Sequence, residues 1–220
     1  NGTNPSNNTK AKGSQLSQLN TPQTQINAVR KKYEGTSQWM KAPNGQPTKL
    51  NEMQWLQVRT PNFKAWFGDW ENDAKNASKV VDANGEPMVV YHGTRTKEKF
   101  TEFYTFTAGI FGAGAYFTVR KHEAGGYAKG GEIYEAFINV KNPLSLSDKA
   151  FMQNYFRPAT QDEAISLGYD AVITTTGAEH KIDYVIAFEP TQIKSATSNT
   201  GEFNPTNPDI RFSRKAKNPI

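Results

Sequence analysis

The chain of 220 residues contains no cysteine. This absence excludes disulfide bonds, thiol nucleophiles and zinc sites built on cysteine. The sequence also has no apolar run long enough to cross a membrane, and no charged segment followed by an apolar one at its N-terminus, so neither a membrane span nor a signal peptide is predicted. Hydrophobic residues are scarce, at 36% with a mean hydropathy of −0.72, which predicts that part of the chain lies outside the packed core.

The charge balance is mildly basic, with a net charge of +5 and a pI of about 9.2. Such a surface suits an anionic partner such as a nucleotide or a nucleic acid, although the same excess is common in proteins that bind neither. Because residue 1 is asparagine and not methionine, we expect the chain to be part of a larger polypeptide.

Composition divides the chain into three parts. Residues 1–50 are rich in Asn, Gln, Thr, Ser and Lys, which predicts a flexible linker with a helix around Ile26 to Tyr33 that forms when a partner receives it. Residues 51–196 contain the strand and helix patterns of a domain. Residues 197–220 are rich in Asn, Thr and Pro and end with basic side chains, which predicts an extended tail.

The middle part has the pattern of an α+β domain, with short strands, turn signals and a few small helices. One helix is predicted to begin at an Asn51 cap. The aromatic residues of Pro61 to Trp70 recur at helical spacing, which favours packing against a sheet over lining a ligand cleft. Asn84-Gly85 predicts a hairpin turn. The remaining predictions are strands at residues 79–81, 89–94, 132–140, 168–173 and 183–188, helices at 119–129 and 162–167, and a polar turn at 174–180.

Two stretches combine residues that suit a binding site. Val89 to Thr94 is a predicted buried strand that ends by presenting the His92 imidazole and the unhindered backbone of Gly93. A lone histidine in such a place is more often a packing residue than a ligand. Gly109 to Thr118 contains three glycines, which leave room for a ligand or another backbone. This stretch lacks the lysine of a P-loop and the strand-to-helix spacing of a dinucleotide fingerprint.

Three segments together resemble the ADP-ribosyltransferase superfamily, in the branch shared by diphtheria toxin and the poly(ADP-ribose) polymerases. His92-Gly93-Thr94 is similar to the family's His-Gly-Ser/Thr strand, and residues 111–117 to its Gly-x-Gly-x-Tyr-Phe element. Tyr127 follows Tyr116 by eleven residues, the spacing of two tyrosines in that family. Residues 61–70, 188–196 and 207–213 resemble the transferase modules of phage and plasmid polyvalent proteins, so the likeness spans roughly residues 60–213.

The resemblance implies a split, mixed or antiparallel sheet and an enzyme that uses NAD as a substrate. Cleavage of the nicotinamide–ribose bond passes through an oxocarbenium-like state, as in glycoside hydrolysis. Tyr116 and Tyr127 would sandwich the nicotinamide ring. Gly93 would bond the carboxamide through its N–H and C=O groups, and His92 would donate to a ribose hydroxyl. Thr94 belongs to the same cofactor-binding motif.

The resemblance also calls for an acid near the ribose, and the sequence leaves its position open. Asp183-Tyr184-Val185 matches the family's pattern with a shorter carboxylate. Counting back eight residues from Gln192 reaches Tyr184 instead. Either the strand carries a bulge, or Gln192 or Glu189 takes the place of the acid. We favour Asp183.

These observations predict an NAD-dependent mono-ADP-ribosyltransferase, an effector or toxin module of phage or mobile-element origin acting in the cytoplasm of a bacterial host. Its acceptor would be an unidentified host protein or nucleic acid. Single transfer is favoured because no convincing counterpart of the polymerases' elongation acid is found. In a separate departure from the polymerases, Ala124 replaces a serine that holds the nicotinamide amide, which implies weaker or differently arranged cofactor binding. The alternatives are an inactive NAD- or ADP-ribose-binding module of a structural phage protein and an NAD-dependent enzyme that removes a 2′-phosphate from RNA.

Overall fold

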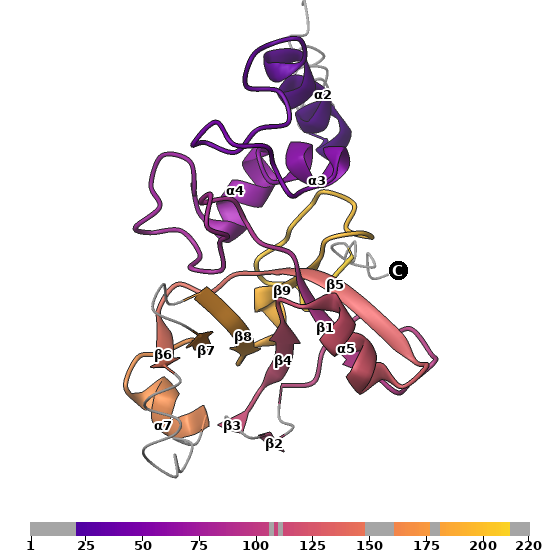
Figure 1. Cartoon of the computed structure of the whole chain (residues 1–220), viewed down its shortest axis with the longest axis vertical. Coiled ribbons are helices and arrows are strands. Elements are labelled where there is room, and N and C mark those ends of the chain that lie inside the picture. The colour runs from indigo at the N-terminus through magenta and orange to yellow at the C-terminus, as the bar shows by residue number, and fades with distance from the viewer. Residues whose placement is uncertain (1–20, 106–107, 110–111, 148–160, 177–180, 212–220) are drawn as a thin grey trace, which may run out of the picture.

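The computed structural model describes residues 21–105, 108–109, 112–147, 161–176 and 181–211. These residues form an α+β fold in which a seven-stranded mixed sheet is accompanied by short helices (Figure 1), as predicted. Phe111, residues 212–213 and the basic residues Arg214, Lys215 and Lys217 lie outside the described residues.

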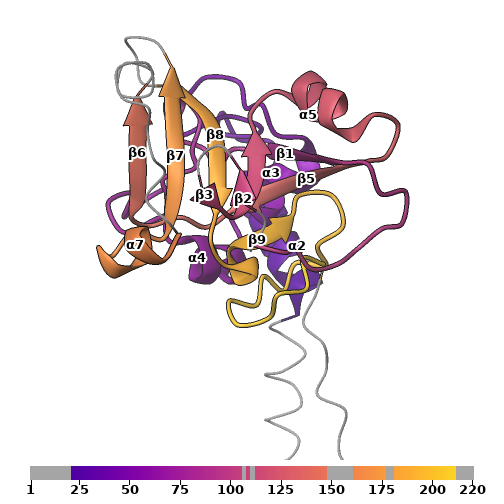
Figure 2. The ribbon, with the colours of Figure 1, turned by 90° about the horizontal axis from the view of Figure 1, so that it is seen from below.

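The sheet has the strand order β6-β7-β8-β4-β1-β5-β9, which Figure 2 shows from below. Only β6 and β7 pair in parallel; the other pairs of this sheet are antiparallel. A separate two-stranded ribbon joins β2 to β3. The strands are β1 (Val90–Thr94), β2 (Ala108–Gly109), β3 (Gly112–Ala113), β4 (Ala115–Thr118), β5 (Glu132–Ile138), β6 (Pro143–Ser147), β7 (Ala171–Thr176), β8 (Lys181–Ala187) and β9 (Ile193–Ser195).

Several predicted strands differ from the observed ones. The Asn84-Gly85 turn is present, but its flanks form a single bridge between Val81 and Pro87 and no strand pair. Strand β6 lies at residues for which the sequence predicted no strand, and β7 continues to Thr176, where the polar turn was expected. Residues 177–180 of that turn lie outside the described residues.

The helices begin at caps that the sequence supplies. Thr21, Asn51 and Thr60 each accept a backbone N–H in the first turn of the helix that follows, which satisfies a donor with no partner inside the helix. The predicted Asn51 cap is confirmed, and Asn51 and Gln54 in addition form a capping box. The helices are α2 (Pro22–Tyr33), α3 (Glu52–Gln57), α4 (Pro61–Phe67), α5 (Lys121–Ala128), α7 (Gln161–Ser166) and the 3₁₀ helix η1 (Pro190–Gln192).

The aromatic residues of α4 pack against the sheet, as predicted. Phe63 is fully buried and meets Phe137 of β5 edge to face, with ring centroids 5.3 Å apart. It stacks on Phe67 at 5.0 Å and meets Phe203 at 4.9 Å. Such aromatic pairs add about 0.5–1.5 kcal/mol each to the free energy gained by burial. The stripe is therefore core and not the wall of a cleft.

Residues 21–50 pack against the rest of the chain. Ile26 and Val29 of α2 are buried in the same cluster as Trp55, and Gln25 exchanges two hydrogen bonds with Asn62. Figure 1 shows α2, α3 and α4 gathered on one side of the sheet. This stretch differs from the flexible linker that its polar composition predicts, because its few apolar residues meet one apolar surface.

A buried arginine ties this helical layer to the turn before β1. The Arg59 guanidinium is almost fully buried, pairs with Glu86 at 2.9 Å and lies 3.8 Å from the centre of the Trp55 ring. Glu86 also accepts a hydrogen bond from Thr48. Burying an unpaired charge costs several kcal/mol. The stability of the fold therefore depends on the helical layer and the turn lying where Arg59 and Glu86 can pair.

Residues 197–211 also pack, in contrast to the extended tail predicted beyond Ala196. Phe203 and Ile210 are buried, and the Asn199 side chain donates to the backbone oxygen of Ile210 at 3.0 Å. The Lys194 ammonium group is buried beneath this segment and donates to the backbone oxygens of Asn207 and Asp209. The boundaries at residues 50 and 196 between linker, domain and tail stay predictions.

The burial of Lys194 predicts an unusual pH dependence of stability. Desolvation lowers the pKa of Lys194 from 10.5 to about 8, against the attraction of Asp209. Between these pH values the unfolded chain binds more protons than the folded chain, so this residue makes the free energy of unfolding rise with pH, by up to about 3 kcal/mol. The Lys194→Met chain should lack this rise in urea titrations at pH 7.5, 9 and 10.5. Parallel curves for the two chains would contradict the assignment.

Candidate active site

Strand β1 and helix α5 touch through their backbones at Gly93. A Cβ atom at Gly93 would lie 1.9 Å from the carbonyl oxygen of Ala124 and 2.9 Å from the backbone nitrogen of Ala128. Only glycine fits at this contact. The predicted glycine therefore has a packing role that sequence reasoning did not assign, because it sets the position of α5 and of Tyr127 on it.

The sheet is split beside this contact. Strands β1 and β5 pair along the whole of Val90–Thr94, whereas β1 and β4 share the single register pair Tyr91–Thr118. Beyond that pair, β1 and β4 separate. A hollow of about 500 Å³ follows, lined by residues of β1, β4, α5, β8 and the glycine-rich stretch: Tyr91, His92, Gly93, Tyr104, Gly109, Gly114, Ala115, Tyr116, Phe117, Thr118, Ala124, Tyr127 and Tyr184.

The structure brings His92 and both predicted tyrosines to this hollow. The Tyr116 hydroxyl donates to the backbone oxygen of Gly112 at 2.5 Å, which fixes its ring. A Cβ at Gly109 would lie 2.4 Å from that ring, so the space left by this glycine is filled by Tyr116. Tyr127 is 61% exposed and lies at the mouth.

The His92 ring is held in one tautomer. Its Nδ1 atom lies 2.8 Å from the backbone oxygen of Tyr116, and a carbonyl oxygen only accepts, so Nδ1 carries the proton. Burial lowers the pKa of His92, while the bond to Tyr116 acts in the opposite direction. The neutral ring then offers Nε2 as an acceptor. A ribose hydroxyl would therefore donate to His92, the reverse of the predicted direction.

A second hollow of about 800 Å³ continues from His92 along β1 and α5. It contains Thr94, the third member of the predicted motif, and it adds two cationic side chains and one carboxylate. Its lining is His92, Gly93, Thr94, Arg95, Glu123, Gly126, Tyr127 and Lys129. A ligand with both a ring and a phosphate group would find suitable partners in the two hollows.

Asp183 lies on a β-bulge. Thr174 of β7 pairs with Tyr184 and Thr175 with Ile182, so Asp183 is the extra residue of β8. The bulge adds one residue to β8. The count of eight residues back from Gln192, which reached Tyr184, missed Asp183 by this one residue. The Asp183 side chain is 14% exposed, forms an ion pair with Arg120 and lines neither hollow that His92 lines.

Glu123 of α5 is a carboxylate that sequence reasoning missed. It accepts hydrogen bonds from the Thr118 hydroxyl at 2.6 Å and from Arg120 at 3.1 Å, and the Tyr184 hydroxyl donates to it. Burial alone would raise the pKa of Glu123, but these three donors outweigh it and lower that pKa. Burial and Glu123 raise the pKa of Tyr184 to about 12, which keeps that hydroxyl protonated. Tyr184 and Tyr127 also share a hydrogen bond.

Gln192 lies away from both hollows, and its side chain bonds to backbone groups of the described residues. Its Oε1 accepts from the backbone N–H groups of Phe188 and Glu189, and its Nε2 donates to the backbone oxygens of Asn139 and Asp170. The amide therefore fastens η1 to two loops. Glu189 is exposed at the start of η1 and lines neither hollow.

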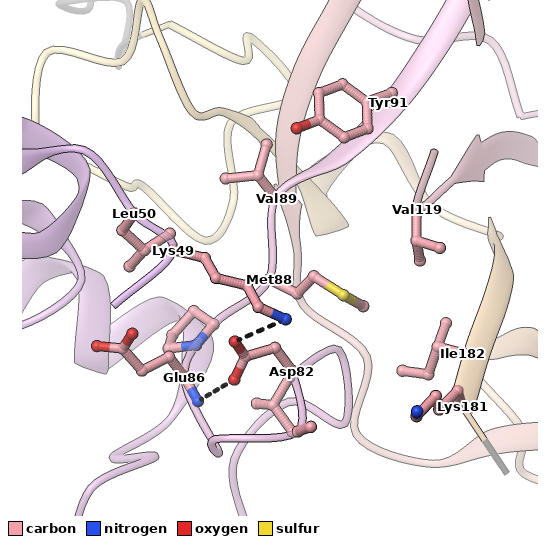
Figure 3. A pocket seen from close by; sticks show the side chains of 13 residues that line it. Lys49, Leu50, Asp82, Glu86, Met88, Val89, Tyr91, Val119, Lys181 and Ile182 are labelled. Atoms are coloured by element: carbon pink, nitrogen blue, oxygen red, sulfur yellow. Dashed lines mark hydrogen bonds and ion pairs between the residues drawn. The ribbon is translucent and has the colours of Figure 1, made fainter. Parts of the chain in front are cut away.

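A third hollow, of about 620 Å³, shares Tyr91 with the first hollow and is drawn in Figure 3. Apolar residues such as Met88, Val119 and Ile182 make much of its lining. The Lys49 ammonium lies 3.8 Å from a carboxylate oxygen of Asp82, as Figure 3 shows. This hollow contains neither His92 nor the tyrosine pair.

The comparison with protein families matches residues 82–203, more than half of the chain, to the model described as ADP-ribosyltransferase in polyvalent proteins. The chain belongs to this family. No curated protein matches it. A solved structure titled "Crystal structure of an anti-CRISPR protein" is similar over 48% of this chain and 91% of its own, at 13% identity and a TM-score of 0.27, which is too weak a likeness to support an argument.

Two further findings concern the described part of the ADP-ribosyltransferase chain. No helix there is long and apolar enough to cross a bilayer. Within the same residues, no group of three or more His, Asp or Glu side chains is arranged to hold a metal ion.

The contact at Gly93 predicts that alanine substitution at two glycines of this site changes the free energy of unfolding in opposite directions. Gly93→Ala should lower the free energy of unfolding by about 3 kcal/mol, because the new methyl group overlaps the α5 backbone. Gly125→Ala is the matched control: its Cβ would meet only Ile133 at 3.8 Å, and the change should stabilise α5 by about 0.5–1 kcal/mol. Chemical denaturation measures both, and equal effects would contradict the close approach.

Proposed function

We propose that the chain is an NAD-dependent mono-ADP-ribosyltransferase of the branch that uses a histidine, a tyrosine and an acid. The single observation that carries the proposal is the meeting of His92, Gly93, Tyr116 and Tyr127 around one hollow where the sheet splits. Membership of the ADP-ribosyltransferase family supports NAD as the substrate.

In this proposal the nicotinamide ring lies between Tyr116 and Tyr127, whose rings line the same hollow from β4 and α5. Stacking holds the ring while the bond to ribose lengthens. The Gly93 backbone bonds the carboxamide, and Nε2 of His92 accepts from a ribose hydroxyl. Gly93 thus orients the nicotinamide and His92 orients the ribose, and neither residue needs to transfer a proton.

The diphosphate of NAD would lie in the second hollow, toward Arg95 and Lys129. Two cations suit two negative phosphates, and Arg offers several N–H donors in a fixed geometry. Ala124 supplies no hydroxyl to the nicotinamide amide, so recognition of that amide depends on Gly93.

The acceptor in this proposal is a protein or nucleic acid of a bacterial host, and the chain acts as an effector or toxin module in the host cytoplasm. The family's occurrence in polyvalent proteins supports an origin in a mobile element. One ADP-ribose is transferred to each acceptor site.

Incubation of the chain with NAD labelled in its adenylate group and a bacterial lysate tests the proposal. The wild type should label a macromolecule and release nicotinamide. His92→Ala and Tyr116→Ala should lose about 100-fold of this activity, because the ribose or the ring is no longer held in position. His122→Ala removes an exposed histidine of α5 outside both hollows and should keep full activity.

The same assay separates the transferase from a binding module and from an enzyme that only hydrolyses NAD. Tight NAD binding without nicotinamide release would contradict the enzyme and support a binding module. Nicotinamide release without labelling of a macromolecule in any lysate tested would indicate NAD hydrolysis and would contradict transfer.

A further inference from the structure

We propose that Glu123, and not Asp183, is the carboxylate that faces the ribose of NAD, and that Asp183 acts through Arg120 as a positioning residue. The inference rests on the proposed function, because it assigns a role within that reaction. It concerns the third catalytic position, which the sequence left open.

The two carboxylates differ in position. Glu123 lines the second hollow, which shares His92, Gly93 and Tyr127 with the first, whereas Asp183 lines neither hollow. Glu123 precedes Tyr127 by one helical turn, so both side chains lie on the same face of α5. The backbone contact at Gly93 fixes that helix against β1.

Several partners orient the Glu123 side chain. Donors from three elements converge on its carboxylate: Thr118 at the end of β4, Arg120 at the cap of α5 and Tyr184 of β8. The side chain is still 29% exposed, compared with 14% for Asp183. Hydrogen bonds that fix a carboxylate before the substrate arrives are typical of preorganised sites.

The charges around Arg120 leave one carboxylate in excess. Arg120 pairs with both Glu123 and Asp183, so the three side chains together carry one net negative charge. Of the two carboxylates, Glu123 is the more exposed and is the one that lines a hollow with His92. The bulge of β8 takes Asp183 out of the regular register with β7, and the Asp183 side chain pairs with Arg120.

The chemical step balances without a further reagent. The bond between C1′ of the ribose and the nicotinamide nitrogen breaks, and its electron pair leaves with nicotinamide, which becomes neutral. The positive charge passes to C1′ and the ring oxygen of the ribose. Glu123 stabilises this charge and accepts a hydrogen bond from a ribose hydroxyl. A nucleophile of the acceptor then bonds to C1′ and loses its proton to water.

The test compares Glu123→Gln with Asp183→Asn in the full chain, with Glu135→Gln as the matched control. Glu135 pairs with Lys121 and lines neither hollow. The readouts are kcat and KM for nicotinamide release and the dissociation constant of NAD. Glu123→Gln should lower kcat about 100-fold with little change in NAD affinity. Asp183→Asn should lower kcat by less than about tenfold, and Glu135→Gln should match the wild type.

A second readout does not depend on catalysis. The dissociation constants of 1-methylnicotinamide, which is cationic, and nicotinamide, which is neutral, are compared by ligand-observed NMR. The wild type should favour the cation, Glu123→Gln should lose this preference, and Asp183→Asn should keep it. Glu123→Asp retains the charge and should recover part of the preference, which separates a charge effect from misfolding.

The outcomes distinguish the two proposals. A loss of kcat confined to Asp183→Asn, or equal losses in both variants with unchanged cation preference, overturns the assignment to Glu123 and leaves the transferase intact. A wild-type chain that binds NAD but releases no nicotinamide overturns the proposed function and this inference with it.

Discussion

The backbone contact between Gly93 and helix α5 is the constraint on which the site depends. It brings a strand and a helix closer together than any side chain would allow, with a virtual Cβ only 1.9 Å from the Ala124 oxygen. Because α5 carries both Glu123 and Tyr127, this one approach places a carboxylate and an aromatic ring beside His92. The glycine that the family motif associates with cofactor recognition therefore also assembles the site.

The split between β1 and β4 complements this contact. A continuous ladder would fill the space that Tyr116 and Tyr127 line, but the two strands share the single register pair Tyr91–Thr118. Thr118, at the end of β4, then contacts Glu123. The same divergence thus opens the hollow and supplies a donor to its carboxylate. The helices α2 to α4 and residues 197–211 support the sheet from the side on which Phe63 packs against Phe137 and Phe203.

The sequence predicted the local features of this protein better than the long-range ones. His92, Gly93, Tyr116 and Tyr127 belong to contiguous motifs, and the structure brings them together. Counting residues along one strand left a bulge at Asp183 as one of two alternatives, and the structure contains that bulge. Glu123 could not be singled out, because helical periodicity does not show which acid faces a hollow formed by other elements. The polar composition of the terminal segments did not indicate the burial of Ile26, Phe203 and Ile210, since that burial depends on surfaces distant in sequence.

A crystal structure of the chain with a carbocyclic NAD analogue, in which the nicotinamide bond is not cleaved, tests the central claim most directly. The account predicts the nicotinamide ring between Tyr116 and Tyr127, its carboxamide on the Gly93 backbone, and the Glu123 carboxylate as the acid nearest the ribose. A nicotinamide ring bound outside this pair of tyrosines, or a ribose next to Asp183 with Glu123 turned away, would contradict it.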